Sequence, residues 1–246
     1  DVCEYKNRVI WGIFNDEVLV FNLDGEIIHS YDNESESTKE LDLSSENVEC
    51  LFKDSEGTVW LGTKRDGIAY YDQNNDKFSR LKLKHGTNPV ENNFVRVIEE
   101  DCFGNIWIGT ESGLYIYNTA KKNINFYGQS FIPAEKGLND KAIYSIFCSN
   151  EKIMWIGTYF SGVNYTSLFQ KGFRNIYADG GKKRLSGNAI SEIIETSDDK
   201  LWIATEDGGI SILDRKSGEF AYLRNASNNI TLPTNNVHAL EEDRNG

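Results

Sequence analysis

The amino-acid sequence predicts an all-β protein made of repeated four-stranded antiparallel sheets, and three observations support this prediction. Glycine is abundant, with 21 residues in a chain of 246, whereas proline occurs only 3 times, which suits many tight turns between strands. Apolar segments are short and rich in β-branched and aromatic residues. Five tryptophans recur at intervals of 47 to 49 residues: Trp11, Trp60, Trp107, Trp155 and Trp202.

Each repeat is predicted to hold four short strands, named a to d in chain order. Strand b contains the tryptophan, strand c follows a glycine, and strand d is marked by Phe78, Phe126, Phe173 or Phe220. Acidic turns such as Asp54 to Gly57 connect strands a and b. Strand a carries two apolar residues three positions apart: Val48 and Leu51, Val95 and Ile98, Ile143 and Ile146, Ile190 and Ile193, Val237 and Leu240.

Four such strands form an antiparallel meander, and a single sheet with two apolar faces is not stable in water. Radial stacking of these sheets as the blades of a β-propeller buries both faces, and a repeat of about 47 residues is typical of this fold. On strand b, tryptophan and the glycine two positions later share one face, where the glycine leaves room for the neighbouring blade. The predicted structural positions are Trp11, Trp60, Gly62, Trp107, Gly109, Trp155, Gly157 and Trp202.

The repeats divide residues 1–246 into about five blades' worth of sequence. Full blades are predicted at residues 47–92, 93–139, 140–187 and 188–234. Residues 1–46 form a degenerate partial blade without a convincing strand a, and residues 235–246 form the first strand of a truncated blade. Either that last strand completes the first blade in a five-bladed ring, or the sequence is cut from a larger propeller, which is the interpretation we favour.

Charge and motifs limit the classes of function. Counting 26 Lys and Arg against 38 Asp and Glu gives 26 − 38 = −12, so nucleic acid is not expected as a partner of this segment. The four cysteines lack paired spacing and the three histidines occupy different repeat positions, so we expect no metal and no cofactor. No catalytic motif is present, and no residue is assigned a catalytic role, although a propeller lyase or hydrolase stays an alternative.

Loops at one end of the blades are the candidate binding surface. The meander places the b to c loops and the d to a connections at the same end, and loops on a rigid scaffold often hold binding residues. Tyr159 and Phe160 would stack on a sugar face, with charged side chains bonding to hydroxyls; alternatively the aromatic pair packs between blades and the charges only face solvent. The candidate ligand-binding residues are Lys64, Arg65, Asp66, Glu111, Tyr159, Phe160, Glu206 and Asp207.

The combined motif resembles the two-component regulator propeller repeats found in ectodomains of hybrid sensor histidine kinases. The motif reads Asn-x-Val-x-x-Leu/Ile, then Asp-x-x-Gly-x-Ile-Trp-Ile-Gly-Thr, then Gly-Leu-x-x-Tyr, and its fullest copy here is residues 93–118. Two departures stand out: Ala204 replaces the glycine of strand b, and the segment from Ser149 to Lys152 replaces the Asp-x-x-Gly turn.

The resemblance implies a part of a seven-bladed periplasmic propeller that belongs to an inner-membrane sensor. It further implies a carbohydrate breakdown product or another small periplasmic ligand, control of polysaccharide utilisation, and a homodimer in the full-length receptor. Kinase activity and membrane attachment would then come from other parts of the protein. The alternative from a different class is a non-catalytic scaffold that holds neighbouring domains or mediates dimerisation.

Overall fold

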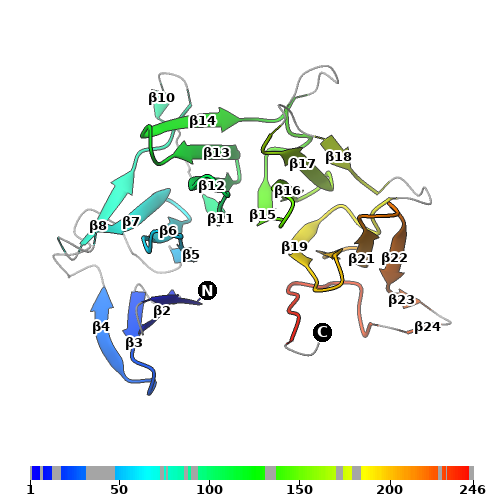
Figure 1. The fold of residues 1–246 in the computed structure, drawn as a ribbon, viewed down its shortest axis with the longest axis horizontal. Helices are drawn as coiled ribbons and strands as arrows, with labels where there is room; N and C mark the ends of the chain where they lie inside the picture. The colour runs from blue at the N-terminus through cyan, green and yellow to red at the C-terminus, as the bar shows by residue number, and fades with distance from the viewer. Residues whose placement is uncertain are drawn as a thin grey trace. The chain divides into compact units, whose positions relative to one another are not determined.

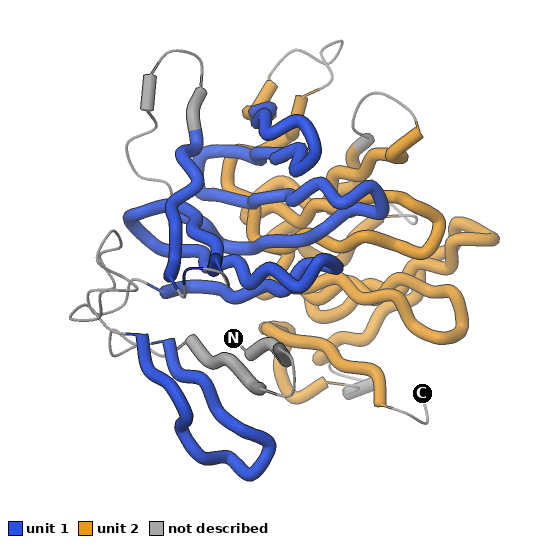
Figure 2. The backbone as a smooth tube through the Cα atoms, turned by 60° about the vertical axis from the view of Figure 1, so that its left-hand side comes forward, with its two compact units in different colours: residues 1–126 blue, residues 127–246 orange. Residues whose placement is uncertain are grey.

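The computed structural model divides into two compact units, residues 1–126 and residues 127–246, called unit 1 and unit 2 below (Figure 2). The structure describes residues 2–5, 8–12, 18–31, 48–72, 75, 77–85, 88–89, 94–130, 137–169, 174–178, 184–226, 229–230 and 232–243. Phe173 and the side chain of Trp11 lie outside the described part of the chain.

Unit 1 contains three four-stranded antiparallel sheets and a short hairpin (Figure 1). In each sheet, consecutive strands pair side by side, in the predicted order a to d. The first sheet is β1 (Val2–Tyr5), β2 (Arg8–Gly12), β3 (Val18–Phe21) and β4 (Ile27–Tyr31). The second is β5 (Val48–Lys53), β6 (Val59–Thr63), β7 (Ile68–Asp72) and β8 (Lys77–Leu81). The hairpin β9 (Lys84–His85) and β10 (Asn88–Pro89) precedes the third, β11 (Val95–Glu100), β12 (Asn105–Thr110), β13 (Gly113–Asn118) and β14 (Asn123–Tyr127).

Unit 2 repeats the same architecture twice. Its first sheet is β15 (Ile143–Cys148), β16 (Ile153–Thr158), β17 (Val163–Ser167) and β18 (Arg174–Ile176). Its second is β19 (Ile190–Glu195), β20 (Lys200–Thr205), β21 (Gly209–Asp214) and β22 (Phe220–Leu223), followed by the hairpin β23 (Asn225–Ala226) and β24 (Asn229–Ile230). The all-β fold class and the four-stranded meander are therefore confirmed. Within the described ranges, no helix is long and apolar enough to cross a bilayer.

The two ends of the chain differ from the sequence prediction. β1 supplies the strand a that we did not expect in the first repeat, pairing Val2 with Trp11 and Tyr5 with Arg8 across the sheet. It escaped sequence analysis because only two residues separate β1 from β2, in place of the acidic turn that marks the other hairpins. At the other end, the described residues 232–243 contain no strand, although a first strand was predicted at 235–246.

The hydrophobic core lies between consecutive sheets, in regions that we call seams. In unit 1, the seam between sheets β5–β8 and β11–β14 contains Trp60, Val95, Ile98 and Tyr115, all buried. In unit 2, the seam between sheets β15–β18 and β19–β22 contains the equivalent Trp155 with Ile190, Ile193 and Leu201. In both seams the tryptophan face of one sheet is thus buried against the next sheet, as the radial stacking of blades requires.

The strand b glycines make this close approach feasible. A methyl group on Gly62 would lie only 2.7 Å from Cγ1 of Val95, which belongs to the next sheet, and 2.4 Å from Sγ of Cys50. At Gly157 a methyl group would lie 2.6 Å from Cγ2 of Ile190. These distances are below van der Waals contact, so a side chain larger than hydrogen does not fit at either position without a shift of its neighbours.

Candidate functional site

A β-bulge recurs at the start of strand a in four sheets. The pairing with strand b shifts by one residue between Val48 and Cys50, and at the equivalent places in β11, β15 and β19. A bulge leaves one residue outside the ladder and redirects its side chain. The four extra residues lie at the end of the sheet where strand b enters the b to c loop, beside the predicted binding residues: Glu49, Arg96, Tyr144 and Ser191.

In unit 1 the bulge residues join two predicted site residues in one charge network. Nη1 of Arg96 lies 3.1 Å from Oε1 of Glu49 and its Nη2 lies 2.6 Å from Oε1 of Glu111. Nζ of Lys64 is 3.7 Å from the second oxygen of Glu49. The guanidinium also covers the ring of Phe94, with 3.9 Å from Cζ to the ring centroid. These partly buried groups link two neighbouring sheets through alternating charges.

Arg65 and Asp66, in the same b to c loop, differ in exposure. Oδ1 of Asp66 forms an ion pair with Nη2 of Arg80, on β8, at 2.9 Å. The backbone N–H of Asp66 donates to Oγ1 of Thr63 at 2.8 Å. Asp66 therefore holds the loop against its own sheet. Arg65 is exposed at the tip of the loop.

In unit 2 the b to c loop presents an aromatic cluster. The rings of Tyr144 and Tyr159 stack with centroids 4.7 Å apart and an interplanar angle of 20°. Phe160 meets Tyr159 edge to face at 4.1 Å, and 71% of Phe160 is exposed. The backbone N–H of Phe160 donates to Oδ2 of Asp140 at 3.0 Å, which fixes the loop. Large exposed aromatic residues on an ordered loop are typical of a binding surface.

The last two predicted residues have different surroundings. Asp207 accepts hydrogen bonds from the backbone N–H groups of Asn188 at 3.1 Å and Ala189 at 3.3 Å, so it connects the loop to the start of β19. Oε1 of Glu206 lies 3.7 Å from Nδ1 of His238, an exposed residue in the C-terminal segment. Sequence analysis did not select His238, Glu49, Arg96 or Tyr144.

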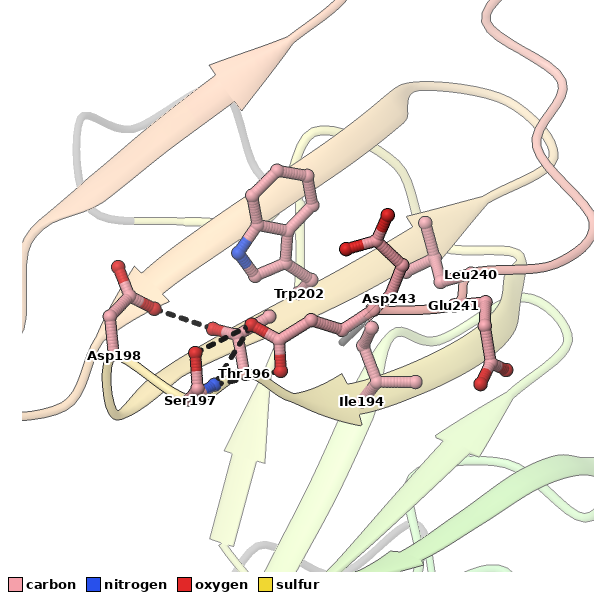
Figure 3. Close-up of a pocket in the computed structure, with 9 residues that line it drawn as sticks. Ile194, Thr196, Ser197, Asp198, Trp202, Leu240, Glu241 and Asp243 are labelled. Carbon is pink, nitrogen blue, oxygen red and sulfur yellow. Dashed lines mark hydrogen bonds between the residues drawn. The ribbon is translucent and has the colours of Figure 1, made fainter. Parts of the chain in front are cut away.

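A second kind of concave surface lies at the opposite end of the sheets, near the a to b turns. A cavity of about 500 Å³ lies there in unit 2. Ile194, Trp202 and Leu240 line it (Figure 3). The backbone N–H of Ser197 donates to Oε2 of Glu242 at 2.9 Å, and the hydroxyl of Ser197 donates to Oε1 of Glu242 at 2.9 Å. No group of three or more potential metal ligands occurs in the residues that the structure describes.

Comparisons with known proteins show what parts of this chain are similar to. The family model of the two component regulator propeller matches residues 42–65, 137–160 and 184–207. Each matched segment spans strand a, the a to b turn and the tryptophan of strand b. Histidine kinase P4 of Formosa agariphila is 25% identical over 181 residues, which cover 72% of this chain and 13% of that protein.

Solved structures share the fold. PorZ, an essential surface component of the type-IX secretion system of Porphyromonas gingivalis, matches with a TM-score of 0.74 and 16% identity, over 97% of this chain and 35% of PorZ. An extracellular domain assigned to a hybrid two component system of B. thetaiotaomicron matches with a TM-score of 0.61 and 21% identity, over 98% of this chain and 37% of that domain. A streptogramin B lyase matches with a TM-score of 0.65 and 15% identity, over 94% of this chain and 68% of the lyase.

The chain therefore spans about a third of the length of the first two structures, and a smaller part of the kinase. The identities between this chain and the solved structures establish the fold alone. All three matched segments include the tryptophan of strand b, and the first two include the glycine two positions later. The first segment also includes the Asp-x-x-Gly turn, Asp54 to Gly57. Three segments of this chain, residues 42–65, 137–160 and 184–207, are thus similar to two-component regulator propeller repeats.

Proposed function

We propose that the chain is the signal-sensing part of a membrane-bound hybrid two-component sensor and lies in the periplasm. The support is the match to the regulator propeller model, the similarity to a histidine kinase, and a fold shared with the extracellular domain of a two component system. In this proposal the segment has no catalytic activity of its own. It binds a small ligand, and the rest of the receptor, as a homodimer, passes the signal across the membrane.

The proposed ligand is a carbohydrate, bound at the b to c loops of unit 2. The observation that carries this proposal is the cluster of Tyr144, Tyr159 and Phe160, which exposes an aromatic ring on a loop fixed by Asp140. The C–H faces of a sugar ring are apolar and pack on an aromatic face, while the hydroxyl groups of the sugar need polar partners. Glu206 and His238 provide such partners in the same unit. Recognition of a polysaccharide breakdown product would couple this site to polysaccharide utilisation.

Calorimetric titration with oligosaccharides, chosen after a glycan array, tests the proposal. Phe160→Ala is expected to weaken binding at least about tenfold, because it removes the exposed stacking surface. Phe169→Ala is the matched control: Phe169 is 72% exposed but lies after β17, at the other end of the same sheet. Binding that both variants weaken equally, or a complete absence of oligosaccharide binding by the full ectodomain, would contradict the carbohydrate part and leave the scaffold alternative.

A further inference from the structure

A cavity of about 460 Å³ lies in unit 1, in the seam between sheets β5–β8 and β11–β14. It is located at the a to b turns, the end of the sheets opposite to the b to c loops. Trp60, Tyr70 and Tyr117 line it with aromatic rings, and Glu56 and Glu100 line it with carboxylates. The ring centroid of Trp60 is 5.6 Å from that of Tyr70 and 6.0 Å from that of Tyr117. Aromatic faces combined with carboxylates favour an organic cation.

The seam between sheets β15–β18 and β19–β22 of unit 2 has the same construction, with equivalent residues 95 positions later in the turns. In unit 1, the backbone N–H of Ser55 donates to Oε2 of Glu100 at 2.7 Å. In unit 2, the backbone N–H of Asn150 donates to Oε2 of Glu195 at 2.9 Å. Glu100 and Glu195 thus accept the same backbone hydrogen bond from the turn of the preceding sheet, and Oε1 of Glu100 also accepts the hydroxyl of Ser55 at 2.8 Å.

The residue after strand c is also equivalent in the two seams, but its side chain differs. Oγ1 of Thr119 donates to the carbonyl oxygen of Gly104 at 2.8 Å. Nε of Arg215 donates to the carbonyl oxygen of Asp199 at 3.3 Å, and Asp199 is the residue 95 positions after Gly104. A threonine in unit 1 therefore stands where unit 2 has an arginine.

The guanidinium of Arg215 fills the seam of unit 2. It forms ion pairs with Glu151 and Glu195, and the side chains of Arg215 and Glu195 are only 10% and 7% exposed. Glu151 is the equivalent of Glu56, and Glu195 is the equivalent of Glu100. In the part of unit 1 that the structure describes, no cation contacts Glu56 or Glu100, and the short side chain of Thr119 leaves the cavity open.

We propose that this cavity of unit 1 binds the guanidinium group of a small alkylguanidinium ligand. The ligand takes the place that Arg215 occupies in unit 2, with Glu56 and Glu100 as its ion-pair partners and the aromatic rings around its alkyl part. Planar guanidinium groups suit both contacts, since they pair with carboxylates and stack on aromatic faces. The site is separate from the carbohydrate surface proposed above.

Other charges that line the cavity are consistent with this assignment. Asp54 accepts bonds from the backbone N–H of Thr58 and Nε1 of Trp60, and Arg80 is paired with Asp66 at 2.9 Å. Lys122 is exposed on the turn between β13 and β14. Asp54 and Arg80 thus already have partners. The remaining charged groups of the lining are the carboxylates of Glu56 and Glu100 and the ammonium group of Lys122, so their net charge is negative and attracts a cation.

The first test compares ethylguanidinium with ethylurea, its neutral analogue of nearly the same shape, in ligand-observed NMR titrations of the intact chain. Ligand concentrations stay in the low millimolar range, far below those at which guanidinium salts unfold proteins. Saturable binding of ethylguanidinium, at least about tenfold tighter than that of ethylurea, is expected from charge-assisted hydrogen bonds. Equal affinity for the two compounds, or binding of neither, would overturn the proposal.

Variants of Thr119 and Glu56 locate the binding in this cavity. Thr119→Arg copies unit 2 and should abolish ethylguanidinium binding while raising the melting temperature, because the new guanidinium adds ion pairs to Glu56 and Glu100. Thr119→Ser keeps the hydroxyl that bonds to Gly104 and should bind like the original chain. Glu56→Gln, at an exposed position, should weaken binding about fivefold. A Thr119→Arg chain that is folded and still binds ethylguanidinium with unchanged affinity would place the ligand elsewhere.

Discussion

Nε1 of Trp107 donates a hydrogen bond of 2.9 Å to Oδ2 of Asp101, six residues earlier in the same hairpin. Both residues are buried, with exposures of 3% and 4%. Oδ1 of Asp101 accepts the backbone N–H groups of Phe103 at 2.9 Å and Asn105 at 3.0 Å. One carboxylate therefore closes the a to b turn and fixes the position of the indole ring. This contact explains the fixed distance between aspartate and tryptophan in the motif.

Replacing that carboxylate tests its contribution to stability. Asp101→Ala should lower the free energy of unfolding by about 3 kcal/mol, because it leaves a buried indole N–H and two turn N–H groups without acceptors. Urea denaturation followed by fluorescence measures the change. Asp101→Asn keeps one acceptor oxygen and should lose less. An alanine variant as stable as the original chain would show that water replaces the carboxylate.

The a to b hairpin of strands β15 and β16 lacks the aspartate, so an acceptor can be added there instead of removed. Ser149 stands in its place, and Nε1 of the buried Trp155 has no hydrogen-bond partner in the described structure. The turn itself is alike, since the backbone N–H groups of Ser149 and Lys152 donate to the carbonyl oxygens of Ile153 and Ser149.

Ser149→Asp should therefore raise the free energy of unfolding by about 1 to 2 kcal/mol, by giving the indole N–H an acceptor. Thermal and urea denaturation would report the gain. Ser149→Ala is the control, because it offers no acceptor and should bring no gain. Equal effects of the aspartate and alanine variants would rule out the hydrogen bond as the cause.

The packing at Gly62 predicts a loss that a second change relieves. Gly62→Ala should destabilise unit 1 by about 1 to 3 kcal/mol, because the new methyl group overlaps Val95 and Cys50. Val95→Ala alone should also destabilise the chain by removing buried methyl groups. If the overlap with Val95 is the cause, the double variant should be more stable than the sum of the two losses predicts. A double-mutant cycle measures this coupling, and strict additivity would contradict it.

Burial of Glu99 predicts a pH dependence of stability. Its pKa is raised to about 7, first by desolvation and then by the neighbouring charge of Glu100, although a backbone hydrogen bond opposes these effects. Between the unfolded value of 4.5 and about 7, the folded chain binds this proton more strongly than the unfolded chain. The contribution of Glu99 to stability therefore decreases as the pH rises through this window, by up to about 3 kcal/mol.

Glu99→Gln should remove this decrease and make the chain more stable than the original at pH 8. Urea denaturation at pH 5, 6, 7 and 8 measures the difference between the two chains. Glu219→Gln, at an exposed position, is the control for the loss of one carboxyl group and should follow the original profile. Parallel profiles for Glu99→Gln and the original chain would mean that Glu99 is ionised and solvated throughout.

Sequence analysis predicted the sheets because their signals are local. Tryptophan, the following glycine and the acidic turn lie within one hairpin, so their spacing alone indicates strand order. One sequence signal was not used: the two apolar residues of strand a are three positions apart, whereas in a regular strand such residues face opposite sides. In the structure Val48 and Leu51 are buried in the same cluster. If both apolar residues are to reach the core, that spacing calls for a bulge between them. Such a bulge redirects Glu49, and equivalent bulges redirect Arg96 and Tyr144 in the next repeats.

What the sequence by itself determined was the repeat, the four-stranded meander and the end of the sheets to which each loop belongs. Only the tertiary structure decided how the candidate residues group and which seam stays open. Arg96 contacts Glu49 from 47 residues away, and Thr119 leaves a cavity beside Glu56 that Arg215 closes beside Glu151. Such contacts join different sheets, and their outcome depends on the size and charge of side chains that stacking brings together.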